Sequence, residues 1–128
     1  MTVALWCVLI AIFLPPLCGL IAKVSSGRFG IRHNHDPRAF LDSLEGLPRR
    51  ANAAQQNGYE AFPAFAAAVI IADLVGNAEQ VTLDVLAVLY ITSRLLYIIC
   101  YLADWATLRS LVWFSGMALI VAMFGISA

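Results

Sequence analysis

Four long apolar segments constrain the fold of this chain more than any other feature of its sequence. They extend over about residues 2–22, 50–73, 82–102 and 108–127. A helix needs about 20 apolar residues to cross a hydrocarbon core of ~30 Å. Of the 128 residues, 62% are hydrophobic and 12% are charged, whereas ordinary soluble domains are roughly 45–50% apolar. The sequence therefore predicts an all-α integral membrane protein, with one four-helix bundle over residues 1–128 in contact with the lipid bilayer.

The first apolar segment is expected to remain in the protein as a membrane span. No Lys or Arg precedes it and no Ala-x-Ala sequence follows it, so two marks of a cleaved signal peptide are missing. Pro15 and Pro16 lie inside this segment, and Pro63 lies inside the second. Because proline removes a helical hydrogen bond, we expect a kink or a local break at the proline pair and a bend at Pro63.

The distribution of basic residues predicts the orientation in the membrane. Six of the eight lie in or beside the first connection, and the connection at residues 76–81 has none. By the positive-inside rule, the first and third connections face the cytoplasm and both termini lie on the opposite side. The six residues are Lys23, Arg28, Arg32, Arg38, Arg49 and Arg50.

Charge and composition argue against several other classes of partner and site. The formal net charge is zero, so nothing indicates a nucleic-acid partner. The three cysteines lie in apolar segments and their number is odd, which argues against a disulfide framework. His33, His35 and Asp36 lie in a connection without further ligands nearby, so we expect no metal site.

Polar residues recur at helical spacing within the apolar segments. A charge at membrane depth costs roughly 2.5–3.5 kcal/mol, so such residues usually face a bundle interior or a wet cavity. On a helix, offsets of 7 and 10 residues return close to the starting face. In the second segment this places three residues on one stripe, namely Arg50, Asn57 and Glu60. A second stripe in the third segment consists of Tyr90, Arg94, Tyr97 and Tyr101.

The two stripes can meet, and two interpretations follow. Arg94 and Glu60 have opposite charges, and pairing lowers the free energy of holding both in a low-dielectric bundle. In a structural interpretation this pair joins two helices, while Tyr90 and Tyr101 anchor the ends of the span at the membrane interface. In a functional interpretation the surplus polar groups, with Arg109 near the same cytoplasmic end, form a site for an anionic or zwitterionic ligand.

The polar residues also form a specific linear pattern. It consists of Arg50-x6-Asn57-x2-Glu60-x2-Pro63, then Arg94-x2-Tyr97-x3-Tyr101, and then Arg109 at the start of the last segment. This pattern resembles the MAPEG family, the membrane-associated proteins in eicosanoid and glutathione metabolism. The connection Asn34-His35-Asp36-Pro37-Arg38-Ala39 resembles the first connection of that family. The resemblance covers the whole chain and is closer to a bacterial branch, so a bacterial inner membrane is the expected location.

The resemblance implies a homotrimer of four-helix subunits that binds glutathione as co-substrate between protomers. It further implies a glutathione transferase or peroxidase that acts on lipophilic small molecules. By position, Arg109 matches the catalytic arginine, and a cation beside a thiol favours the thiolate, which is the nucleophile. The implied glutathione contacts are Arg50, Asn57, Glu60, Arg94, Tyr97 and Tyr101.

One departure from the family pattern leaves a second function class open. Several catalytic relatives place an arginine four residues before the asparagine, where this chain has Ala53. That carboxylate clamp is then either missing or replaced by Arg49 or Arg50. The alternative is a non-catalytic membrane bundle that binds a small anion or a partner protein. A small multidrug exporter is disfavoured because the first segment contains no carboxylate.

Overall fold

The computed structural model describes all 128 residues and consists of helices joined by short connections, with no strand. Four helices are long and apolar enough to cross a membrane. They confirm the predicted all-α four-helix bundle. The four are α1 (Val3–Ser26), α3 (Gly46–Val75), α4 (Gln80–Leu102) and α5 (Ala106–Gly125). The first connection contains the 3₁₀ helix η1 (Ile31–His35) and the short helix α2 (Pro37–Asp42).

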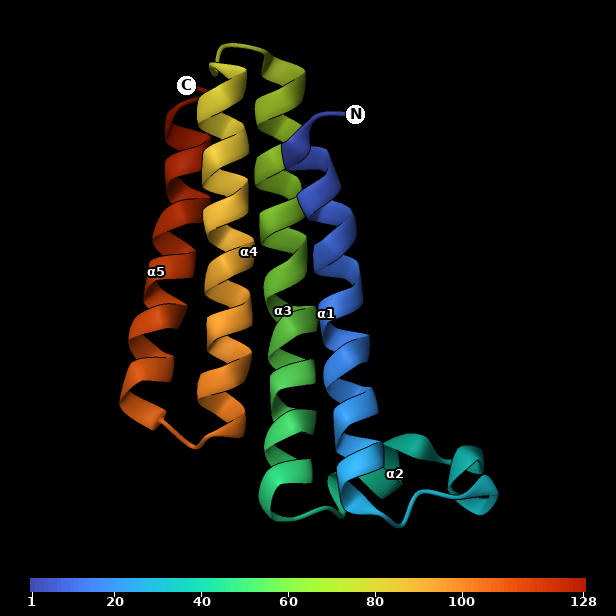
Figure 1. The fold of residues 1–128 in the computed structure, drawn as a ribbon. Coiled ribbons are helices and arrows are strands. Elements are labelled where there is room, and N and C mark those ends of the chain that lie inside the picture. The colour runs from blue at the N-terminus through green and yellow to red at the C-terminus, as the bar shows by residue number, and fades with distance from the viewer.

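Successive long helices are antiparallel, so the chain crosses the bundle up and down four times (Figure 1). Both termini lie at one end, beside the connection between α3 and α4, and the first connection lies at the other end. Helices α3 and α4 each pack against all the other long helices, whereas α1 and α5 lie at opposite edges of the bundle. The termini therefore share one side, as four membrane crossings require.

Helices α1 and α3 extend beyond the apolar segments that predicted them, whereas α4 ends at the predicted residue and α5 ends at Gly125, slightly before its predicted end. Helix α1 ends at Ser26 and α3 at Val75, and the glycine that follows each of them is left-handed, with φ of 62° at Gly27 and 72° at Gly76. Left-handed glycine is a common helix terminator. Helix α3 begins at Gly46 and includes the polar stretch that precedes its apolar part. Apolarity thus marks the part of the helix that crosses the membrane, and the glycines mark its backbone ends.

Helices α1 and α3 approach each other closely around small residues. A Cβ atom on Gly58 would lie 2.8 Å from Cγ of Pro15, and one on Gly19 would lie 2.6 Å from Nε2 of Gln55. Small residues allow membrane helices to pack tightly. Both helices are continuous through their prolines, so the local break considered at Pro15 and Pro16 does not occur.

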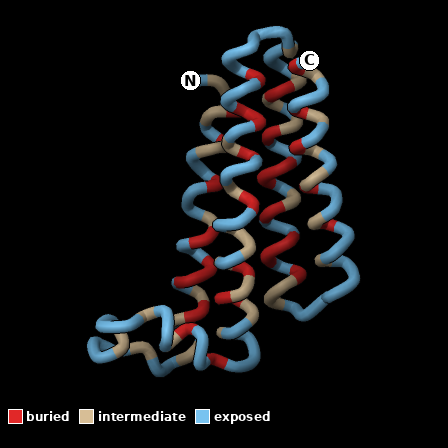
Figure 2. Tube along the Cα trace, turned by 180° about the vertical axis from the view of Figure 1, so that it is seen from behind, coloured by how far each residue is buried: buried red, intermediate tan, exposed pale blue.

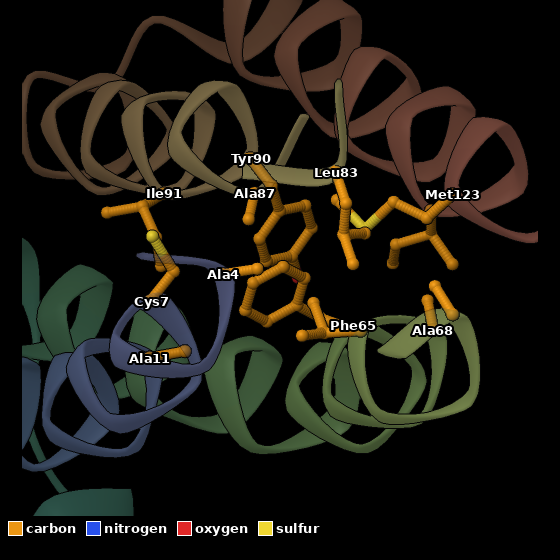
Figure 3. Close-up of a cluster of buried hydrophobic side chains, with 13 residues drawn as sticks. Ala4, Cys7, Ala11, Phe65, Ala68, Leu83, Ala87, Tyr90, Ile91 and Met123 are labelled. Atoms are coloured by element: carbon orange, nitrogen blue, oxygen red, sulfur yellow. The ribbon is translucent and has the colours of Figure 1, made fainter. Parts of the chain in front are cut away.

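The main core lies in the half of the bundle near the termini. Figure 3 shows the Phe65 ring from α3 stacked on the Tyr90 ring from α4, with centroids 4.0 Å apart and planes 12° apart. Leu83 and Met123 lie nearby and are fully buried. Buried residues follow the inner faces of the helices and exposed residues cover the outside (Figure 2). Tyr90 is 2% exposed, so it belongs to the core and is not an interfacial anchor.

A carboxylate on α4 joins that helix to α1, at the end of the bundle that carries the termini. Oδ1 of Asp84 accepts a hydrogen bond of 2.8 Å from the backbone N–H of Ala4, in the first turn of α1. The same oxygen accepts one of 2.8 Å from Nε2 of Gln80. Because the first N–H groups of a helix have no helical partner and carry partial positive charge, Asp84 stabilises the start of α1.

The outer surface is largely apolar, as expected of a protein in contact with lipid. Large hydrophobic side chains are exposed on every long helix. In a soluble monomer such extended apolar surface would mark an interaction site. Examples are Phe13, Leu17, Ile71, Leu74, Val85, Leu96, Leu111, Phe114 and Val121.

Candidate functional site

Arg94 is the most deeply buried charged residue of the bundle. It lies on α4 and is 5% exposed. Its Nη2 donates a hydrogen bond of 2.9 Å to Oδ1 of Asn57 on α3. Its guanidinium lies 4.2 Å from the ring centroid of Tyr97, one turn later on α4. The guanidinium is thus held by an amide on one helix and an aromatic face on its own.

The aromatic contacts continue along α4 to the last helix. The Tyr97 and Tyr101 rings meet edge to face with centroids 5.6 Å apart. The guanidinium of Arg109, on α5, lies 4.3 Å from the Tyr101 ring centroid. Asn57, Arg94, Tyr97, Tyr101 and Arg109 therefore form one continuous set from three helices, which we call the polar row. The sequence predicted all five as site residues, and the structure brings them together.

A tight turn places Arg109 at the end of the polar row. After α4 ends at Leu102, Asp104 adopts a left-handed backbone with φ of 62°, a conformation in which Asp is enriched relative to most residues. The N–H of Trp105 donates a hydrogen bond of 2.8 Å to the carbonyl of Cys100. Helix α5 then begins at Ala106 and runs back along α4. Arg109, in the first turn of α5, consequently reaches the Tyr101 ring.

Glu60 lies near Tyr97, close enough for an electrostatic interaction, but forms no direct contact with the polar row. It is exposed on α3 and makes no hydrogen bond or ion pair within the chain, so the considered pair between Glu60 and Arg94 does not form. Arg94 bonds to Asn57 instead. Three residues correspond to about 300° on a helix, so Glu60 is rotated by roughly 60° from Asn57. That rotation takes its carboxylate out of the interface between α3 and α4.

Arg50 contacts the backbone of α4 and lies outside the polar row. Its Nε and Nη2 donate hydrogen bonds of 3.2 and 3.1 Å to the carbonyl of Leu102. The last carbonyls of a helix have no helical donor, and basic side chains often satisfy them. Arg50 therefore links the start of α3 to the end of α4.

A polar cleft near the first connection was not predicted from the sequence. It has a volume of about 590 Å³ and lies between the end of α1, the first connection and α3. We call it the connection cleft, and its polar lining consists of Lys23, His35, Asp36, Arg38, Gln55 and Tyr59. The last two are four residues apart on α3 and so share one helix face. That spacing was the available signal, but only the fold brings the basic residues opposite them.

Helix α3 consequently carries two polar faces. Gln55 and Asn57 differ by two residues, which is about 200° of rotation. The first lines the connection cleft and the second belongs to the polar row.

Comparison with known proteins places the chain in a family. The sequence profile of the MAPEG family matches residues 3–128. No curated protein and no solved structure matches the chain. The matched region contains all four membrane-spanning helices, and the protein is an integral, multi-pass membrane protein. On this match over nearly its whole length, the chain belongs to the MAPEG family.

Proposed function

We propose that this protein is a glutathione-dependent membrane enzyme that conjugates or reduces lipophilic substrates. The observation that carries the proposal is the polar row, in which Arg94 and Arg109 each lie on a tyrosine ring with no carboxylate beside them. Cations without a counter-charge in an apolar bundle favour an anionic ligand. Membership of the MAPEG family supports the choice of glutathione.

The residues of the row divide between binding and chemistry. Arg109 is half-buried at the end of the row, where its charge would favour the thiolate of a bound glutathione. That thiolate attacks the electrophilic carbon of the substrate, and the leaving group departs with its electron pair. Tyr101 and Asn57 supply hydrogen bonds to the peptide. Arg94 and Tyr97 are each 5% exposed and too buried for a broad ligand contact. They position Asn57 and Tyr101 through the Arg94–Asn57 hydrogen bond and the contact between the two tyrosine rings.

Glu60 and the connection cleft support the proposal that the enzyme is a homotrimer. An exposed carboxylate that faced lipid would cost roughly 2.5–3.5 kcal/mol at membrane depth. A second copy that covers Glu60 removes that penalty. The connection cleft lies on a different face of α3, so the row of one copy can face the cleft of the next. Such head-to-tail contacts close into rings, and the family resemblance implies a ring of three.

In this arrangement glutathione lies between two copies. Glu60 would bind its ammonium group, and basic residues of the neighbouring cleft would bind its carboxylates through charge-assisted hydrogen bonds. Arg50, which already bonds to the end of α4, would help to bind these carboxylates. We further propose a bacterial inner membrane with the first connection in the cytoplasm, where glutathione is supplied. The excess of basic residues in that connection supports this orientation.

The test combines glutathione titration calorimetry with a conjugation assay on a chlorodinitrobenzene-type electrophile, using the detergent-purified protein. Glu60→Gln is expected to weaken glutathione binding at least about tenfold, the equivalent of ~1.4 kcal/mol. Arg109→Met should retain binding and lose turnover. Arg32→Ala is the matched control, because Arg32 is exposed in the first connection and belongs to neither site. Absence of binding at millimolar glutathione in the unaltered protein would refute the proposal.

A non-catalytic bundle that binds a small anion is the second candidate. The observation in its favour is that Arg50 already bonds to a backbone carbonyl, while Ala53 occupies the position of the arginine in several catalytic relatives. Glutathione binding without turnover of any electrophile would favour this candidate. Rapid turnover that is lost in Arg109→Met would exclude it.

A further inference from the structure

A small, partly open cavity lies between α1, α3 and α4. Its volume is about 20 Å³, and its lining includes Ala11, Pro15, Ala54, Tyr90 and Arg94. A cavity of at least ~10–15 Å³, measured in this way, can hold one water molecule. This cavity therefore has room for a single water and not for a larger ligand.

Three polar groups at this cavity have hydrogen-bonding capacity that the chain does not use. Arg94, at 5% exposure, uses one of its several N–H donors, in the bond to Asn57. The Tyr90 hydroxyl makes no hydrogen bond, although the residue is 2% exposed. Pro15 has no N–H, so the carbonyl of Ala11, four residues earlier in α1, lacks its usual helical donor. Buried polar groups in native proteins nearly always have a partner, either protein or ordered water.

We propose that the cavity holds one buried water molecule that bridges α1 and α4. The water accepts a hydrogen bond from the Arg94 guanidinium and donates one to the Ala11 carbonyl, and the Tyr90 hydroxyl is its third partner. Buried waters typically make about three hydrogen bonds of this kind. A chloride ion fits less well, because a carbonyl oxygen repels an anion whereas it accepts a proton from water.

The bound water fixes the guanidinium through N–H donors that Asn57 does not use. Asn57 holds Arg94 from α3, and the water ties it to the backbone of α1 at the proline. Because Pro15 has no N–H, the Ala11 carbonyl is free to accept this hydrogen bond, which it would not be in a helix without the proline. This inference concerns the interior of a single chain and does not depend on glutathione binding.

The first test is a double-mutant cycle on thermal stability in detergent. Ala54→Val puts two methyl groups at the cavity and displaces the water, so the apparent Tm should fall by several degrees in the otherwise unaltered protein. In an Arg94→Met background the water loses its charged donor and binds less tightly, so the same substitution should lower the Tm clearly less or raise it. Ala68→Val is the control, since Ala68 is buried in the main core and does not line this cavity. Its effect should be equal in both backgrounds.

Two outcomes of this cycle would overturn the proposal. A rise in Tm for Ala54→Val alone would indicate that the methyl groups fill an empty apolar space. An equal fall in both backgrounds would indicate simple overpacking with no link to Arg94.

The second test is a structure of the unaltered protein in a lipid nanodisc, at a resolution that shows ordered waters. We expect one density peak within hydrogen-bond distance of the Arg94 guanidinium and the Ala11 carbonyl. An empty cavity in a map that shows other internal waters would refute the proposal. An anomalous peak there in crystals grown with bromide would assign the site to an anion and would also refute it.

Discussion

The close contact between α1 and α3 at Gly58 predicts a specific effect of adding one methyl group. In Gly58→Ala the new Cβ would lie 2.8 Å from Cγ and 3.2 Å from Cβ of Pro15. Non-bonded carbon atoms are most stable at about 3.5–4.0 Å, so the two helices must separate by roughly 1 Å. The proline ring cannot rotate out of the way. The strain therefore falls on the helix interface.

The size of the effect follows from two opposing terms. Overpacking of a well-packed interior costs typically about 1–3 kcal/mol. Replacing glycine by alanine inside a helix stabilises the folded state by roughly 0.5–1 kcal/mol, because alanine loses less backbone entropy on folding. We therefore expect Gly58→Ala to lower the free energy of unfolding by about 1 kcal/mol or somewhat more.

The assay is equilibrium unfolding in mixed micelles with increasing SDS, followed by tryptophan fluorescence. Gly116→Ala is the matched control, because its Cβ would lie 3.4 Å from Oγ of Ser93 and 3.7 Å from Cε2 of Tyr90, which are ordinary contacts. It should keep the entropy gain and stabilise the protein by up to ~1 kcal/mol. Equal effects of the two substitutions, or a more stable Gly58→Ala protein, would refute the packing argument.

Three further predictions concern single contacts of the bundle. Arg50→Met removes the donors to the end of α4, so amide hydrogen exchange in the last turn of that helix should accelerate. Asp84→Asn weakens the charge interaction with the N–H of Ala4 at the start of α1 and should lower stability by about 0.3–2 kcal/mol in SDS unfolding. Phe65→Ala removes the ring stacked on Tyr90. Its cost in the same assay should be near the lower end of ~3–5 kcal/mol, because the unfolded state in lipid also keeps the side chain in an apolar medium.

Apolar length and helical spacing predicted the outline of this protein. The four apolar segments gave the number and order of the long helices, because only helices satisfy the backbone of a single membrane span. Arg94, Tyr97 and Tyr101 were expected on one face of the third segment, and they follow one another along α4. Spacing within a helix is fixed by its own geometry, so this part of the site needed no knowledge of the fold.

The contacts between helices could not be predicted in the same way. Asn57 and Glu60 were both placed near Arg94, and the structure selects Asn57. The selection depends on how α3 is rotated about its axis, and periodicity does not determine that rotation relative to a neighbour. The connection cleft was missed for a related reason, since Arg38 and Gln55 face each other only when the first connection folds back over α3.

The hydrogen bond from Ala4 to Asp84 has a consequence for biogenesis. It joins residues 80 positions apart, and a nascent chain emerges from the ribosome N-terminal end first. The first span therefore enters the bilayer with the leading N–H groups of its helix still lacking this acceptor. The Ala4 N–H gains its acceptor only when α4, which carries Asp84, is inserted beside α1. The first helical turn to be synthesised is therefore among the last to form all its hydrogen bonds.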